Sequence, residues 1–78
     1  MNRKPQVGDL IQWSEGQVGV LVERFDLYQR AKLATRNYSP RWCWHIVFFG
    51  PIPISYNTVY GVSEATIMRE TLLKILNN

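Results

Sequence analysis

A chain of 78 residues is long enough for one domain, and 46% hydrophobic with 19% charged residues is the composition of a folded domain, not a disordered segment. The single cysteine excludes an intrachain disulfide and a four-cysteine zinc site, and no apolar run approaches the roughly 20 residues that cross a bilayer. The formal net charge of +3 favours acidic partners, nucleic acid included. We therefore expect a domain without membrane contact, located in the cytoplasm or in a particle assembled there.

The N-terminal part of the sequence predicts a polar arm followed by a β-hairpin. Residues 1–6 are polar, so we expect a flexible arm there and a single folded domain over residues 7–78. An apolar run at 10–13 and an alternating run at 18–23 each predict a strand, and the polar turn between them contains a glycine. Inside the second strand, Gly19 indicates a bulge or a bend.

A long basic segment follows the hairpin. Residues 24–41 contain four arginines and one lysine but only one acidic residue, Asp26. The segment ends in Asn-Tyr-Ser-Pro, which is typical of a chain turn. We expect a long loop with one helical turn, and loops of this length in small domains are often functional.

The second half of the chain predicts two strands and a helix. Alternation over residues 42–49 places apolar side chains on both faces, which predicts a central strand covered on both sides. A Gly-Pro-Ile-Pro run ends it, and residues 54–60 predict a further strand. Ser63 is expected to cap a C-terminal α-helix over residues 64–76, where apolar residues repeat at helical spacing.

The first hairpin resembles a known class of small β-barrels. The stretches VGDLI at Val7–Ile11 and GQVGVLVE at Gly16–Glu23 are similar to the opening of SH3-like bacteriophage proteins and KOW-type modules, which begin "VGD" and continue "G-x-x-G-x-V". The resemblance implies a mainly β fold, a small SH3-like barrel of four to five strands, here with a long basic loop and a C-terminal helix. Such modules bind RNA, DNA, peptides or neighbouring subunits, and a phage-encoded one would act in the host cytoplasm.

Little in the sequence indicates catalysis. Cys43 and His45 share a strand face, but such a pair is nucleophilic only when the cysteine loses its proton, and we expect both to be packed. Two ligands are too few for a closed zinc site, the six acidic residues are scattered, and no phosphate loop or dinucleotide motif is present. We predict a non-enzymatic protein with no catalytic residue, cofactor, metal or small-molecule substrate.

An uncharged stretch is the first candidate for a partner-binding surface. Residues 42–63 contain no Asp, Glu, Lys or Arg, which is typical of the core of a protein interface; alternatively, the C-terminal helix covers this stretch. We favour a protein-interaction module, a phage-encoded subunit that docks on a larger assembly or self-associates. Its predicted anchors are Phe49, Ile52, Ile54 and Tyr56, and its predicted polar rim is Arg30, Lys32 and Arg36.

The basic segment is the second candidate, and it supports the alternative function of nucleic-acid binding. Its cations would contact phosphates and its tyrosines would stack on bases. The plainer interpretation is a solvated loop whose charges keep the domain soluble. The residues of this alternative site are Tyr28, Arg30, Lys32, Arg36 and Tyr38.

Overall fold

A β-hairpin opens the fold in the computed structural model, which describes residues 4–33, 35–69 and 73–76. β1 (Leu10–Trp13) and β2 (Val18–Asp26) run antiparallel, as predicted. Gly16 adopts a φ of 99° in the turn between them, and its N–H donates to the carbonyl of Trp13. This left-handed conformation is why glycine is favoured at that turn position.

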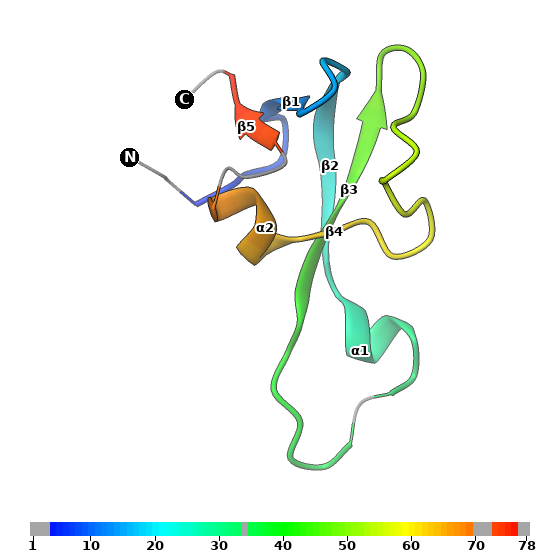
Figure 1. The fold of residues 1–78 in the computed structure, drawn as a ribbon. Coiled ribbons are helices and arrows are strands. Elements are labelled where there is room, and N and C mark those ends of the chain that lie inside the picture. The colour runs from blue at the N-terminus through cyan, green and yellow to red at the C-terminus, as the bar shows by residue number, and fades with distance from the viewer. Residues whose placement is uncertain (1–3, 34, 70–72, 77–78) are drawn as a thin grey trace.

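Five antiparallel strands form one curled sheet in the order β4-β3-β2-β1-β5 (Figure 1). β3 (Trp42–Phe48) pairs along the length of β2, and α1 (Leu27–Arg30) lies at one end of that pair. The two edges of the sheet are β4 (Val62–Ser63) and β5 (Leu73–Ile75), which are separated in the chain by α2 (Glu64–Arg69). The protein is mainly β with a short helix near its C-terminal end, and its identity as an SH3-like barrel stays a prediction.

The core is a set of apolar side chains dominated by aromatic rings. The rings of Trp13, Phe48 and Tyr56 pack edge to face, with centroid separations of 5.9, 5.8 and 5.1 Å. Pairs of this geometry contribute about 0.5–1.5 kcal/mol beyond the apolar area that they bury. The buried core residues are Ile11, Trp13, Leu21, Trp44, Ile46, Tyr56, Val62 and Ile67.

β3 is covered less completely than the sequence predicts. Trp44 and Ile46 are buried in the core, whereas Val47 on the opposite face is 53% exposed. The reason is that α2 packs Ile67 into the same core as Trp44, so it does not cover the outer face of β3. The outer face is buried only near its start, at Cys43.

The predicted strand over residues 54–60 is wrong. These residues form turns, with one isolated bridge between Asn57 and Gly61. The Asn57 side chain explains the difference, because its Oδ1 accepts hydrogen bonds from the backbone N–H groups of Val59 and Tyr60 at 2.8 and 2.7 Å. Local side-chain bonding of this kind competes with strand pairing.

The predicted helix over residues 64–76 is also wrong in its second half. Ser63 does cap α2, since its Oγ accepts from the N–H of Thr66, but α2 ends at Arg69 and β5 follows. β5 pairs with β1, with Ile11 opposite Ile75. Pairing with β5 gives hydrogen-bond partners to backbone groups of β1 that would otherwise form an open sheet edge. This stabilisation outweighs the helix that the apolar spacing predicts for these residues. Residues 70–72 and 77–78 lie outside the described chain.

The basic segment is shorter than predicted. Residues 24–26 belong to β2 because they pair with the first residues of β3. α1 is the single helical turn that was expected, and the remaining loop covers residues 31–41, of which Ala34 lies outside the described residues. The predicted arm over residues 1–6 is described only from Lys4, and Pro5 within it is buried.

The predicted bulge in β2 lies at a different residue. The register between β2 and β3 shifts between Leu21 and Glu23, not at Gly19. Gly19 instead marks a close approach of the two strands, because a Cβ there would lie 2.7 Å from Ile46 Cγ2 and 2.7 Å from the Val47 carbonyl oxygen. None of the helices in the described ranges is long and apolar enough to cross a membrane.

Replacement of Gly61 by alanine is expected to destabilise the protein by about 2–4 kcal/mol. Gly61 has a φ of 68°, and a Cβ at this position would meet the carbonyl oxygen of Trp44. Urea unfolding monitored by circular dichroism measures the change. Gly50→Ala is the matched control, since nothing lies within 4 Å of its added Cβ. Equal stability losses in the two variants would contradict this explanation.

Candidate functional sites at the two ends of strand β3

β3 connects the two surfaces that the sequence singles out. Trp42 begins the strand beside the loop over residues 31–41, and Phe48 ends it beside the loop over residues 49–61 (Figure 1). At about 3.3 Å per residue, the two ends lie roughly 20 Å apart. The two surfaces are therefore separate sites.

The loop over residues 49–61 is fixed to the core by inward-facing groups. Pro53 and Tyr56 are buried, and the Tyr56 hydroxyl accepts a hydrogen bond from the backbone N–H of Ile46 at 3.0 Å. Trp13 Nε1 donates to the Ser55 hydroxyl at 2.9 Å. Burial raises the pKa of the Tyr56 hydroxyl, which keeps it neutral. The loop is consequently a defined platform for its outward-facing side chains.

Three of the four predicted anchors point outward from this platform. Phe49 is 67% exposed, Ile52 is 55% exposed and Ile54 is 98% exposed. We call these three exposed residues, which the sequence predicts as anchors for a protein partner, the apolar docking surface. The fourth, Tyr56, is only 8% exposed because its ring belongs to the core, so it positions the loop and offers no surface of its own. With Ile54 this open, the helix that the sequence offered as a cover does not shield it.

At the other end of β3, Asp26 joins the two ends of the basic segment. Its Oδ1 accepts from the backbone N–H groups of Tyr28 and Arg41 at 3.2 and 3.1 Å, and its Oδ2 accepts from the Tyr38 hydroxyl at 2.9 Å. Burial acts to raise the pKa of the Asp26 carboxyl. The hydrogen bonds together have the larger effect and lower the pKa, so the group stays ionised. The hydrogen bond that Tyr38 donates to Asp26 raises the pKa of Tyr38. Tyr38, a predicted stacking residue, is thus engaged inside the protein.

Arg30, predicted for both candidate sites, is paired with Glu23. Its Nη1 and Nη2 donate to the two carboxylate oxygens at 3.1 and 2.7 Å, and its guanidinium lies 4.3 Å from the centroid of the Phe25 ring. His45 Nδ1 lies 3.0 Å from the same carboxylate. The hydrogen bonds from Arg30 and His45 lower the pKa of Glu23 to about 2. The charge of Arg30 is therefore largely matched within the domain.

Arg24 holds an exposed tryptophan in place. Its Nε and Nη2 donate to the carboxylate of Glu64 at 2.8 and 3.3 Å, and Trp44 Nε1 donates to the same carboxylate at 2.9 Å. Burial acts to raise the pKa of Glu64, but Arg24 and Trp44 lower it more. The Arg24 guanidinium lies 4.0 Å from the centroid of the Trp42 ring, a cation–π contact. Trp42 is 39% exposed, unlike Trp13 and Trp44, which are buried.

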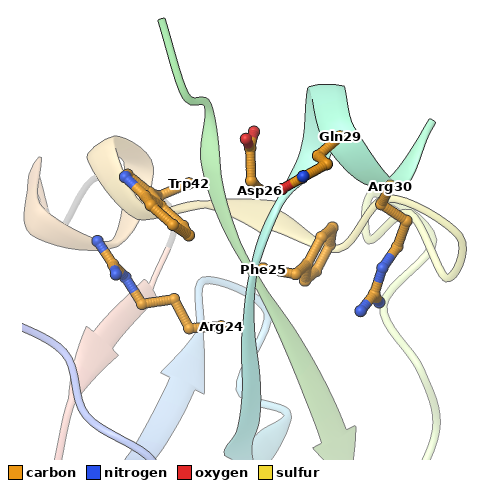
Figure 2. Close-up of a pocket in the computed structure, with 6 residues that line it drawn as sticks. All are labelled: Arg24, Phe25, Asp26, Gln29, Arg30 and Trp42. Carbon is orange, nitrogen blue, oxygen red and sulfur yellow. The ribbon is translucent and has the colours of Figure 1, made fainter. Parts of the chain in front are cut away.

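Two shallow clefts share Trp42 as a wall. The first cleft, of about 360 Å³, is drawn in Figure 2, with Arg24 beside Trp42 and Arg30 beside Phe25. Its lining residues are Arg24, Phe25, Asp26, Gln29, Arg30 and Trp42. The second cleft, of about 390 Å³, is lined by Pro40, Arg41, Trp42, Ser63, Glu64, Ala65 and Met68.

The remaining cations of the basic segment face solvent. Lys32, Arg36 and Arg41 are exposed, and for Lys32 and Arg36 no ion pair is found with any described residue. Tyr28 is half-buried. Of the five residues predicted for nucleic-acid binding, the structure leaves Lys32 and Arg36 open to an external partner and uses Arg30 and Tyr38 internally.

Cys43 and His45 are both engaged within the fold. Burial raises the pKa of the Cys43 thiol, against a smaller lowering effect of Arg41, so the neutral thiol is favoured. His45 Nδ1 faces Glu23, and Nε2 lies 3.2 Å from the carbonyl oxygen of Val59. Cross-strand pairing also brings Glu23 opposite His45, a neighbour that the scattered positions of the acidic residues in the sequence do not indicate. Within residues 4–33, 35–69 and 73–76, no three His, Cys, Asp or Glu side chains gather to hold a metal ion.

Sequence reasoning also missed Trp42 as a surface residue. Alternation placed it on the same face as Trp44, and the alternation is correct within the regular part of the strand. The signal that distinguishes Trp42 is its position as the first residue of β3, directly after an exposed Pro40-Arg41 pair.

Comparisons with protein-family models, with curated proteins and with solved structures give no match to this chain.

The Glu23 cluster is expected to stabilise the protein in a pH-dependent way. Because the pKa of Glu23 falls from 4.5 to about 2 on folding, its stabilising effect is fully present above pH 4.5 and is lost as the pH falls toward 2. Thermal unfolding between pH 7 and pH 2 measures this effect. Glu23→Gln should unfold at a lower temperature at pH 7, and its difference from the wild type should shrink below pH 4.5. A difference that is constant with pH would contradict the ionic explanation.

Proposed function

We propose that the protein is a non-catalytic interaction module that meets another protein surface through the apolar docking surface. The exposure of Ile54 carries this proposal. A nearly fully exposed isoleucine, with Phe49 and Ile52 exposed on the same loop, is an unusual concentration of apolar area on a domain of 78 residues. A contiguous exposed apolar patch on a small protein commonly marks a protein-interaction site, and we propose that these three side chains form one.

The anchoring of the loop supports a docking role. A flexible apolar loop would lose conformational entropy on binding, but this loop is already fixed by Tyr56 and by the Trp13–Ser55 hydrogen bond. Binding to a pre-organised loop avoids much of that cost. The apolar side chains are therefore displayed in the conformation in which they would contact a partner.

The charge distribution supports a second copy of this chain as the occupant. Each copy carries a net charge of +3, so there is a net electrostatic repulsion between two copies. The stretch over residues 42–63, which includes the apolar docking surface, carries no formal charge. In a two-fold arrangement the same patch meets itself, and an uncharged patch does so without opposing like charges.

Ile54→Asp is expected to convert a dimer into a monomer without unfolding the protein. Two carboxylates would face each other across a desolvated contact in the dimer, whereas the side chain at position 54 is in solvent in the single domain. Light scattering on the purified protein, at low and high salt and with no nucleic acid, measures the mass. The wild type should have twice the monomer mass at both salt concentrations.

Val7→Asp is the matched control, since Val7 is 69% exposed but lies outside the apolar docking surface. It should leave the dimer intact. A wild-type protein that stays monomeric up to millimolar concentration would overturn the proposed self-association. A monomer mass in this measurement, followed by a rise in mass when nucleic acid is added in a second one, would favour the alternative function of nucleic-acid binding.

A further inference from the structure

We infer that Trp42 and the second cleft form a binding site for single-stranded nucleic acid, distinct from the apolar docking surface. Trp42 would stack on an unpaired base, and Arg41 would contact the adjacent phosphate. This inference does not rest on self-association, because it uses the opposite end of β3 (Figure 1).

The Trp42 ring is both exposed and rigidly held. It begins a strand, and Arg24 lies 4.0 Å from its centroid while being fixed in turn by two hydrogen bonds to Glu64. A ring held in this way needs little ordering when a base stacks on it. Base–aromatic stacking is tolerant of sequence because every base has a π-face.

Trp42 lines the second cleft, whereas Arg24 does not. Arg24 lines the first cleft beside Trp42 but is absent from the second, whose apolar walls are Pro40, Ala65 and Met68. The cleft volume of about 390 Å³ lies within the range of roughly 300–1,000 Å³ that is usual for small-molecule pockets. A planar, largely apolar group that enters this cleft would meet both the indole and these aliphatic groups.

The electrostatics of this end of the protein favour an anionic ligand. The acidic groups nearby are already satisfied, since Asp26 accepts from three donors and Glu64 from Arg24 and Trp44. Arg41 lines the second cleft, and the exposed Lys32 and Arg36 lie on the same loop. Ring and cations together match the alternating bases and phosphates of a single strand.

The site at Trp42 differs from the nucleic-acid site that the sequence of the basic segment predicts. Of the residues in that prediction, Arg30 is paired with Glu23 and Tyr38 donates to Asp26, so both already have a partner within the domain. Trp42 takes their place as the stacking ring, and Arg41 as the cation that lines the same cleft. Lys32 and Arg36 keep the role of contacts to more distant phosphates.

The first experiment measures binding of fluorescein-labelled dT12 by fluorescence anisotropy, together with tryptophan emission. Trp13 and Trp44 are buried, so quenching by the oligonucleotide should come from Trp42. With three cations on phosphates, the slope of log K against log salt concentration should be about −2. Duplex DNA of the same length should bind more weakly because its bases are not free to stack.

Substitutions separate stacking from charge. Trp42→Leu should weaken dT12 binding about tenfold or more, whereas Trp42→Tyr, which keeps a ring, should retain most of it. Tyr60→Leu is the matched control, because Tyr60 is a half-exposed ring that lines neither of the two clefts. Arg41→Gln should weaken binding and flatten the salt slope by about 0.7, and Arg41→Lys should restore both.

Three outcomes would overturn the inference. The first is an absence of dT12 binding at low salt by a folded wild-type protein. The second is equal binding of dT12 by Trp42→Leu and the wild type. The third is equally tight binding of a ten-residue glutamate peptide, which would identify the site as a general acidic-peptide surface. Because the oligomer mass is measured without nucleic acid, failure here and failure of the self-association are separate results.

Discussion

The hydrogen bond from the Ile46 N–H to the Tyr56 hydroxyl is the contact on which the end of the domain beside the loop over residues 49–61 depends. It satisfies a backbone group of β3 where β4 does not reach, and it brings the Tyr56 ring against Trp13 and Phe48. The same contact draws a proline-rich, uncharged loop onto the core. The exposure of Ile54 is therefore a result of how the core is completed, since Pro53 before it and Tyr56 after it turn inward.

Ion pairs and hydrogen bonds to carboxylates organise the opposite end of the domain, near the start of β3, in a comparable way. Each of three carboxylates, Glu23, Asp26 and Glu64, is held by donors from distant parts of the chain. Together they fix the end of β2, both ends of the basic segment and the start of α2. Of the five cations in the basic segment, Arg24 and Arg30 form ion pairs, whereas the exposed Lys32, Arg36 and Arg41 lie on the loop between α1 and β3.

The elements that the sequence predicts well are those whose pattern is local. The hairpin around Gly16 and the strand that starts at Trp42 follow from turn chemistry and alternation, and both are present. The errors concern residues whose state depends on distant partners. Asn57 bonds its own loop, and Leu73–Ile75 joins β1 instead of extending the helix. Exposure of Ile54 was predictable from its uncharged, proline-rich surroundings, whereas Trp42 shares a strand face with the buried Trp44 and is exposed because it begins β3, beside a cleft that α2 also lines.

The pairing of β1 with β5 has a consequence for biosynthesis. The partner of Ile11 is Ile75, so nearly the whole domain must be translated before one edge of β1 finds its neighbour. At ~5–20 residues per second, that interval lasts several seconds. During this time the nascent hairpin presents an unpaired apolar edge, the type of surface to which chaperones and other nascent chains bind. Truncation near the C-terminal end would make that temporary exposure permanent.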